Sequence, residues 1–440
     1  MKRILTLIAI LLVFNSSVFA QSFLEDITLS LDKGKEAVYA KGDTIRLFAE
    51  TMAEKSSVLK VYENGCLSQT LTRTIPAGKS EIFTISYNRP VALMLRLSDP
   101  AHPTDSTTVG AIVSPEEFEP GFVDPADFDT FWKKQLRALR KTKMKPILTP
   151  VEVPGKDGEK FLCYDLEINC IDGAPVRGYL ALPKESAKRS LPIVIFAHGA
   201  GNLRESWTQS SVKKAVSLAK KGGGAIALDI NAHGMLNGMT EDYYVNLQQE
   251  LKGYYNREVL SHENFYFRTM FLRMVRALDY LCSRKEWDGK RVLVTGGSQG
   301  GAQGTALAGL DSRVTMMVVD VPAMWDVGGA LKGRSSGWPK QLEKQGLNSS
   351  AVDILPYYDG SNMLRRYHGG LVVNVGLIDM TCPPAAVWSA FNVCPSASKE
   401  IHPNAWKGHS AKYSLPAERR KETKQEANAI LDNAINAYLQ

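Results

Sequence analysis

The chain has 440 residues, of which 44% are hydrophobic and 22% charged, and its formal net charge is +7 at pH 7. That composition is typical of a globular protein, and the length exceeds what one hydrophobic core usually serves, so we predict two domains. The Lys and Arg residues form no dense cluster facing aromatic residues, which argues against nucleic acid as a partner.

The first twenty residues, Met1–Ala20, have the pattern of a secretory signal peptide. Lys2 and Arg3 precede the apolar run Ile4–Phe14, which is too short to span a bilayer, and small residues follow. A buried N-terminal helix or a membrane anchor is the alternative, but the order of charged, apolar and small residues favours a cleaved signal. We therefore predict an exported protein, periplasmic or extracellular, without stable membrane insertion.

The six cysteines are sparse and include no C-x-x-C pair. Export permits disulfides, but this spacing indicates neither a disulfide scaffold nor a zinc site. We expect most of the cysteines to be buried free thiols, and Cys382 with Cys394 is the first pair to check.

Residues 21–113 are predicted to form an all-β domain. Apolar residues alternate with polar ones in five short runs separated by Gly-, Asn- or Pro-bearing turns, as in half-buried strands. The runs are Ile27–Leu31, Ile45–Ala49, Phe83–Tyr87, Val91–Leu97 and Val109–Val113. Short antiparallel strands at this spacing suggest an immunoglobulin-like sandwich. The domain carries no catalytic constellation, so carbohydrate binding and a purely structural role both stay open.

An acidic, proline-containing stretch at 114–125 is the predicted linker, and residues 126–440 are predicted to form an α/β domain. A helix runs from Ala126 to about Lys141, and a second apolar stripe at helical spacing runs from Phe267 to Leu281. Several apolar runs suit strands buried on both faces. They are Leu191–Ala197, Ala225–Leu228, Val292–Thr295, Met316–Val319 and Leu371–Val375. Strands alternating with helices predict a mostly parallel sheet with helices on both faces.

The turn Gly296–Gly301 contains a G-x-S-x-G core between a strand and a small-residue helix. In such a turn the glycines leave room for a serine hydroxyl above the sheet. A bare G-x-S-x-G can also be a closely packed or phosphate-binding turn. The strand before it and the helix after it favour a nucleophile at Ser298, with the amide of Gln299 facing a developing oxyanion.

A serine nucleophile needs a base to take its proton and a carboxylate to orient that base. In this architecture the acid and then the base follow the serine along the chain. His409 lies in a loop after the strand candidate Lys399–Ile401 and is the predicted base. The other downstream histidines, His368 and His402, are predicted to be packed or exposed.

The acid and a second oxyanion donor are expected at other strand ends. Asp379 begins the loop after the apolar run that starts at Leu371, whereas Asp320 ends an earlier strand and is the runner-up. The loop His198–Asn202 follows the first core strand, and its small residues allow close backbone approach. We predict the amide of Ala200 as the second donor and interpret His198 as a brace for this loop.

Four segments together resemble the acetyl xylan esterase / cephalosporin-C deacetylase family, carbohydrate esterase family 7. They are Asp127–Trp132, His198–Gly201, Ser283–Gly301 and Gly376–Pro384, and the resemblance covers about residue 124 to the C-terminus. The resemblance implies an α/β-hydrolase fold, removal of acetyl groups from sugar hydroxyls and no cofactor; we expect no metal site. By position it assigns Ser298, Asp379 and His409 as the triad, and the amides of Gln299 and Ala200 as the oxyanion hole.

Three positions depart from the family pattern. The stretch Asn231–Gly234 replaces the usual Arg-Gly-Gln, Ser410 replaces a glutamate after the histidine, and Ala200 replaces a tyrosine. The lost tyrosine predicts a wider acyl pocket that tolerates propionyl and butyryl esters, unless Trp207 or a residue of the insertion Tyr243–Tyr255 closes it. The other two departures leave loop bracing and homo-oligomerisation open, and His233 is either a polar replacement or an exposed loop residue.

Aromatic residues in two insertions could overhang the catalytic face and stack on sugars, or could be core residues. They are Tyr243, Tyr244, Tyr254, Tyr255, Trp325 and Trp338. The sequence favours a serine esterase that removes acetyl or other short acyl groups from sugars derived from plant polysaccharides such as xylan. An esterase or peptidase for bulkier substrates, or a non-catalytic carbohydrate-binding protein on a hydrolase scaffold, is the alternative.

Overall fold

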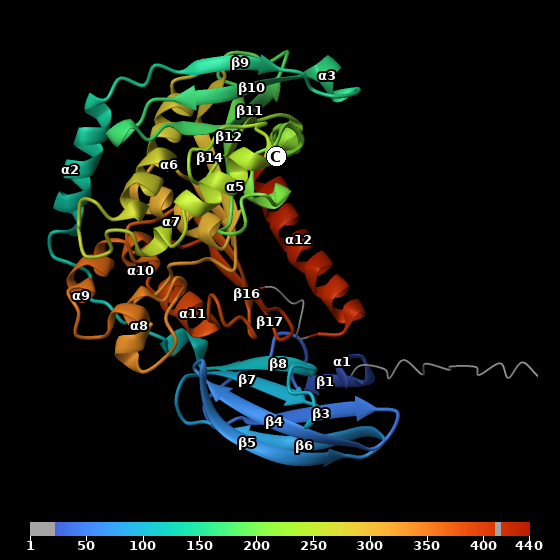
Figure 1. Cartoon of the computed structure of the whole chain (residues 1–440). Coiled ribbons are helices and arrows are strands. Elements are labelled where there is room, and N and C mark those ends of the chain that lie inside the picture. The colour runs from blue at the N-terminus through green and yellow to red at the C-terminus, as the bar shows by residue number, and fades with distance from the viewer. Residues whose placement is uncertain (1–22, 410–414) are drawn as a thin grey trace, which may run out of the picture.

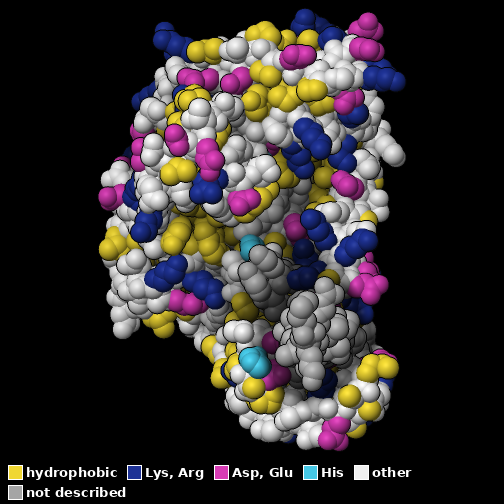
Figure 2. Space-filling model, turned by 45° about the vertical axis from the view of Figure 1, so that its right-hand side comes forward, with side chains coloured by type: hydrophobic (Ala, Val, Ile, Leu, Met, Phe, Trp, Pro, Cys, Tyr) yellow, Lys and Arg dark blue, Asp and Glu magenta, His cyan; other side chains and the backbone are white. Residues whose placement is uncertain are grey.

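The computed structural model describes residues 23–409 and 415–440, so the predicted signal peptide lies outside the described residues. An α/β body and a smaller all-β body lie one against the other (Figure 1). Over the α/β body, Lys and Arg side chains are interspersed with Asp and Glu on the face drawn in Figure 2. Among residues 23–409 and 415–440, no helix is both long enough and apolar enough to cross a bilayer.

The N-terminal strands form two sheets over a shared core, after a short helix α1 (Phe23–Asp26). Their bounds are β1 (Ile27–Leu31), β2 (Val38–Tyr39), β3 (Thr44–Thr51), β4 (Lys55–Glu63), β5 (Cys66–Ile75), β6 (Gly78–Ser86), β7 (Val91–Ser98) and β8 (Ser106–Val113). One sheet has the order β1-β3-β6 and the other β2-β8-β7-β4-β5. The pairing is antiparallel apart from the short parallel pair β2–β8. The all-β prediction agrees with these strands, and the immunoglobulin-like topology stays a prediction.

A nine-stranded mixed sheet forms the centre of the larger body, in the order β17-β16-β15-β14-β12-β13-β11-β10-β9. The strands are β9 (Ile147–Val151), β10 (Phe161–Ile168), β11 (Val176–Pro183), β12 (Leu191–Ala197), β13 (Ile226–Ile230), β14 (Trp287–Gly297), β15 (Met316–Asp320), β16 (Gly370–Gly376) and β17 (Lys399–Asn404). From β13 to β17 neighbouring strands are parallel, whereas β9, β10 and β11 add an antiparallel edge. The sequence predicted the parallel part and missed this edge.

Helices cover both faces of the sheet, as predicted. They are α2 (Phe128–Lys141), α3 (Asp157–Lys160), α4 (Val212–Ala219), α5 (Glu241–Glu250), α6 (Tyr266–Cys282), α7 (Gln299–Leu310), α8 (Gln341–Gln345), α9 (Ala351–Ile354), α10 (Gly360–Leu364), α11 (Pro384–Asn392) and α12 (Ala417–Leu439). Successive side chains of a strand point to opposite faces. In β12, Ile193 and Ile195 pack in the core that contains α6 and α7, while Val194 packs with α4 and α12.

All six cysteines are free, including Cys382 and Cys394. Four of the six are buried, as expected for structural thiols; Cys282 is half-buried and Cys66 is exposed.

The segment after β15 contains a buried ionic network that the sequence did not predict. Arg334 donates to Asp326 Oδ2 at 2.6 Å, and Asp359 Oδ1 accepts from the backbone N–H groups of Asp326 (3.1 Å) and Ser361 (2.7 Å).

The Asp359 carboxyl should make the unfolding free energy depend on pH. Burial raises its pKa to about 7, and the neighbouring Asp326 carboxylate raises it as well. An Asp in the unfolded chain has a pKa near 3.9. Between about pH 4 and pH 7 the folded protein therefore binds one proton more than the unfolded chain does. The stabilisation is therefore complete below about pH 4 and is lost as the pH rises through about 7. We expect Asp359→Asn to flatten the fall in unfolding free energy between pH 5 and pH 7.

Urea unfolding at a series of pH values measures this effect. The control is Asp353→Asn, because Asp353 is an exposed carboxylate in the neighbouring helix α9. An unchanged slope in Asp359→Asn, matching that of Asp353→Asn, would contradict the assignment.

Candidate active site

Ser298 occupies the turn between β14 and α7 in a strained conformation, with φ 53° and ψ −121°. Such backbone angles cost on the order of 1–3 kcal/mol and persist only where the surroundings enforce them. Here the Ser298 N–H donates to the carbonyl of Asp320 at 2.9 Å, and its own carbonyl accepts from Ala323 at 2.9 Å. Gly300 allows close packing beneath, since a Cβ there would lie 2.1 Å from the carbonyl oxygen of Ala197. The predicted sharp turn is present and projects the serine from the sheet edge.

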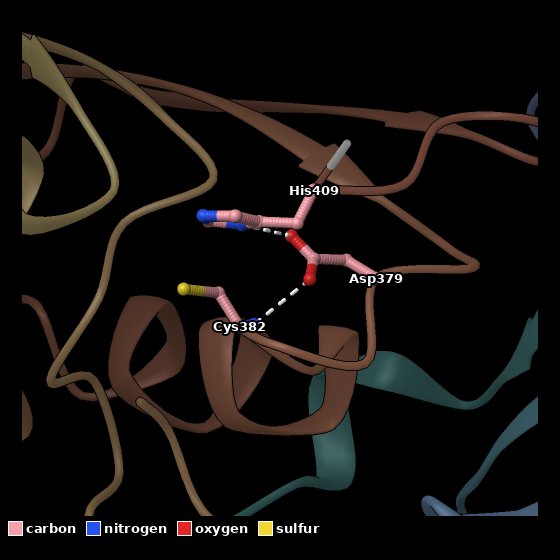
Figure 3. A group of neighbouring side chains, drawn as sticks. All are labelled: Asp379, Cys382 and His409. Atoms are coloured by element: carbon pink, nitrogen blue, oxygen red, sulfur yellow. Dashed lines mark hydrogen bonds and ion pairs between the residues drawn. The ribbon is translucent and has the colours of Figure 1, made fainter. Parts of the chain in front are cut away.

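Three segments bring the predicted nucleophile, base and acid into one hydrogen-bonded chain. His409 Nε2 lies 2.9 Å from Ser298 Oγ, and His409 Nδ1 lies 2.9 Å from Asp379 Oδ2. Figure 3 shows the Asp379 carboxylate between the imidazole and the turn at Cys382. Since a carboxylate only accepts, Nδ1 carries the hydrogen, and the lone pair of Nε2 faces the serine hydroxyl.

The turn after β16 fixes the orientation of Asp379. The second oxygen, Oδ1, accepts from the backbone N–H groups of Thr381 and Cys382, each at 2.8 Å, and the residue is 1% exposed. The runner-up acid, Asp320, instead accepts from Lys407 Nζ (3.1 Å) and Asn374 Nδ2 (2.8 Å). The Asp320 carboxylate therefore ties neighbouring strand ends together, and among the described residues it has no hydrogen bond to His409.

The other downstream histidines lie away from this chain. His402 is on β17 and is 3.5 Å from Glu400, and His368 precedes β16. His198 is buried, and both of its ring nitrogens are engaged: Nδ1 with the carbonyl of Trp207 at 2.8 Å and Nε2 with Asp229 Oδ1 at 2.5 Å. With both nitrogens engaged, His198 has no free lone pair for a substrate proton, and it braces the loop as predicted.

The two predicted oxyanion donors belong to segments that lie next to Ser298. Gln299 is the first residue of α7, and the loop with Ala200 passes next to Ser298, because a Cβ on Gly199 would lie 3.7 Å from Ser298 Cβ. Gln303 Nε2 donates to the carbonyl of His198 at 3.0 Å, which ties this loop to α7. A backbone amide at each position is suited to bind a negative oxygen.

His233 is packed beneath the site, which answers the question left open by the sequence. Its Nδ1 lies 2.8 Å from Tyr266 Oη, and its ring centroid lies 4.7 Å from that of Tyr254. Tyr254 in turn donates to the side-chain oxygen of Gln299. Burial, and then Arg273, lower the pKa of His233 to about 3, so the ring is neutral near pH 7. The replacement for the family's arginine is therefore an uncharged support behind the Gln299 turn.

Trp207, which the sequence analysis named as a side chain that could close the pocket at Ala200, lies at the site. Its side chain packs against the loop after β12, since a Cβ on Gly201 would lie 2.2 Å from Trp207 Cη2. The Cβ position of Gly199 is 3.5 Å from Trp207 Cζ3 and 3.7 Å from Ser298 Cβ. The indole thus lies beside Ala200 and near the serine, yet Trp207 is 55% exposed.

The aromatic insertions are mostly core. Trp325 is fully buried and donates to Thr305 Oγ1 at 2.8 Å, and Tyr244 and Tyr254 are also buried. The half-buried pair Tyr255 and Trp338, with ring centroids 5.7 Å apart, is still available for contact with a substrate.

Asp379, Cys382 and His409 each offer a possible metal-ligand atom, and these atoms lie within 4.8 Å of one another (Figure 3). However, the Asp379 oxygens and His409 nitrogens are already engaged in hydrogen bonds. Burial, followed by the Asp379 charge, raises the pKa of the Cys382 thiol, which keeps it protonated, whereas a metal binds the thiolate. The group therefore suits a hydrogen-bonded triad with a neutral thiol beside it.

Comparisons with known proteins identify the family of this chain. The family model for acetyl xylan esterase (AXE1) matches residues 115–423. Acetyl esterase Axe7A of Xylanibacter ruminicola is 33% identical over 332 residues, which cover 74% of this chain and 73% of that protein.

Two solved structures have the same α/β-hydrolase fold. The acetyl xylan esterase from Paenibacillus sp. R4 is 25% identical, with a TM-score of 0.56 over 72% of this chain and 98% of that one. Acetyl xylan esterase 1 from Thermoanaerobacterium sp. JW/SL YS485 is 23% identical, with a TM-score of 0.53 over 72% and 97%, and supports the fold alone. By the family match and the identity to the Xylanibacter protein, this chain is a carboxylic ester hydrolase that belongs to the acetyl xylan esterase family.

Proposed function

We propose that this protein is a serine esterase that removes acetyl or other short acyl groups from sugars of plant polysaccharides such as xylan. The observation that carries the proposal is the continuous chain from Ser298 Oγ through His409 to Asp379, with both links at 2.9 Å. Such a chain activates a hydroxyl that is otherwise a weak nucleophile. The family membership and the acetyl esterase relative supply the substrate class.

The geometry supports an acyl-enzyme mechanism. Ser298 Oγ attacks the ester carbonyl while its proton passes to His409 Nε2, and Asp379 stabilises the imidazolium that results. The carbonyl oxygen becomes an oxyanion that the amides of Gln299 and Ala200 stabilise. His409 then donates the proton to the departing sugar oxygen, which leaves the acyl group on Ser298. Water, deprotonated by His409, attacks that ester and releases the carboxylic acid, so the enzyme needs no cofactor.

On the acyl side of the proposed site, Ala200 stands where the family pattern has a tyrosine. The sequence predicted a widened pocket at Ala200 unless another side chain closes it, and the indole of Trp207 packs against the same loop. We therefore propose Trp207 as the wall that limits acyl length.

We further propose that the protein is exported, on the support of the signal-like sequence Met1–Ala20. N-terminal sequencing of the protein from the periplasm or the medium is expected to begin at Gln21. A mature protein that retains Met1 would contradict export through this signal.

Removal of a triad residue should abolish turnover and leave the fold intact. Ser298→Ala should lower kcat on 4-nitrophenyl acetate by on the order of 10⁶. Asp379→Asn should lower kcat by about 10⁴, because the amide favours the wrong imidazole tautomer. His409→Ala removes the base and should lower kcat about as much as Ser298→Ala does. Steady-state kinetics measure kcat, and circular dichroism on the same preparations checks that each variant is folded.

The matched control is His402→Ala, because His402 is a half-exposed histidine on β17. This variant should keep near-normal kcat. Normal turnover in His409→Ala, together with loss in His402→Ala, would refute the assignment of the base.

Trp207→Ala should change acyl selectivity. One methylene in an apolar pocket is worth about 1–3 kcal/mol, so loss of the indole should raise kcat/KM for butyryl relative to acetyl esters by about tenfold or more. Ala200→Tyr should favour acetyl further without abolishing turnover, since the donor is the backbone amide. Leu67→Ala, at a residue 53% exposed on β5, is the control. Unchanged selectivity in Trp207→Ala would contradict the proposal.

A further inference from the structure

The core of the all-β body includes side chains of the α/β body. Leu377, Ala385 and Ala405 are 2%, 1% and 0% exposed, and they belong to the same buried cluster as the inward-facing residues of β1–β8. Leu377 lies two residues before Asp379, and Ala405 lies four residues before His409. The β1–β8 core is thus completed by the segments that lead into the acid and the base.

Backbone contacts hold the same two segments. Gly110 of β8 donates to the carbonyl of Ala405 at 2.8 Å, and Ala405 donates to the carbonyl of Lys35 at 2.7 Å. Trp406 Nε1 donates to the carbonyl of Leu29 at 3.2 Å. The β1–β8 domain therefore holds the segment before His409 from three points along its own chain.

Gly110 also contacts the segment before the acid. A Cβ on Gly110 would lie 2.4 Å from the carbonyl oxygen of Leu377 and 2.8 Å from Leu377 Cβ. No positive φ is recorded for Gly110, so the need for glycine here is one of space. One backbone position of β8 thus touches both segments.

The two segments are joined to each other as well. The Leu377 N–H donates to the carbonyl of Asn404 at 3.0 Å, and the Ile378 N–H donates to the carbonyl of Lys407 at 3.1 Å. A displacement of either segment is therefore passed to the other. Ser298, by contrast, is fixed by backbone bonds to Asp320 and Ala323 inside the α/β body.

We propose that the β1–β8 domain is a positioning element of the active site, which sets the acid and base loops against the nucleophile through Gly110. This inference rests on the proposed function of the triad. The domain holds two members of the triad and not the third. A shift at β8 thus changes the distance from His409 to Ser298 and leaves the substrate pocket around Trp207 and Ala200 in place.

The test is Gly110→Ala in the full chain, assayed on 4-nitrophenyl acetate. A misplacement on the order of 1 Å far from the chemistry can cost about 10²-fold, so we expect kcat to fall by between tenfold and 100-fold. KM should change by no more than about twofold, because the pocket is not displaced.

The matched control is Gly158→Ala in α3. A Cβ there would also lie 2.4 Å from a backbone carbonyl oxygen, that of Val153, and α3 lies at the end of the molecule away from β1–β8 (Figure 1). This variant should keep kcat although it also brings a Cβ to 2.4 Å from a carbonyl oxygen. A normal kcat in folded Gly110→Ala, or equal losses in both variants, would overturn the proposal.

A second pair of variants decides the matter if Gly110→Ala does not fold. Trp406→Phe removes the donor to Leu29, whereas Trp388→Phe on α11 removes a buried indole N–H that has no hydrogen-bond partner among residues 23–409 and 415–440. We expect a fall in kcat for Trp406→Phe alone, and equal kcat values would overturn the proposal. Ser298→Ala separates the triad mechanism from the positioning role of the β1–β8 domain. If Ser298→Ala is inactive while the Gly110 and Trp406 variants have a normal kcat, the esterase mechanism stands and the positioning role is refuted.

Discussion

The site depends on one constraint, which is that parallel strands carry their carboxyl ends to a single edge of the sheet. In the order β17-β16-β15-β14-β12, those ends supply His409, Asp379, Asp320, Ser298 and the Ala200 loop in turn. Because β15 lies between the strands of the acid and the nucleophile, Asp320 is free to pair with Lys407 and Asn374 and to accept the Ser298 N–H. The runner-up acid thus supports the turn on which the proposed nucleophile lies.

The sequence predicted those features that short-range patterns encode. The run Leu191–Ala197 coincides with β12, and the stripe from Phe267 to Leu281 lies within α6. The glycine-rich turn singled out Ser298, and the chain order of strand ends singled out Asp379 and His409, which the structure brings together. These predictions depend on local periodicity and turn chemistry, which a single sequence shows directly.

The features that the sequence missed depend on contacts between distant segments. Strand β5 consists mostly of exposed and half-buried residues, and β4 has fully buried residues at only a few positions. The alternation of apolar and polar residues in these two strands is therefore weak. In the antiparallel edge β9–β11, strand β9 likewise has only exposed and half-buried residues, so it also lacks a clear apolar alternation. Nothing local to Gly110, Leu377 or Ala405 indicates that they meet, and the pairing of Arg334 with Asp326 depends on a fold that excludes water.

The same exclusion of water explains why Ser298, rather than the neighbouring thiol of Cys382, is the group suited to attack. A free thiol is intrinsically the more acidic, but Cys382 is 1% exposed, and burial and the Asp379 charge raise the pKa of its thiol. A thiolate there would place a second negative charge beside Asp379 and compete with it for the imidazole. Ser298 is half-buried, is projected by its strained turn, and faces the lone pair of His409 Nε2. Access and the position of His409 Nε2 therefore favour Ser298 as the proposed nucleophile, and the neutral thiol lies beside the imidazole without disturbing the His409–Asp379 pair.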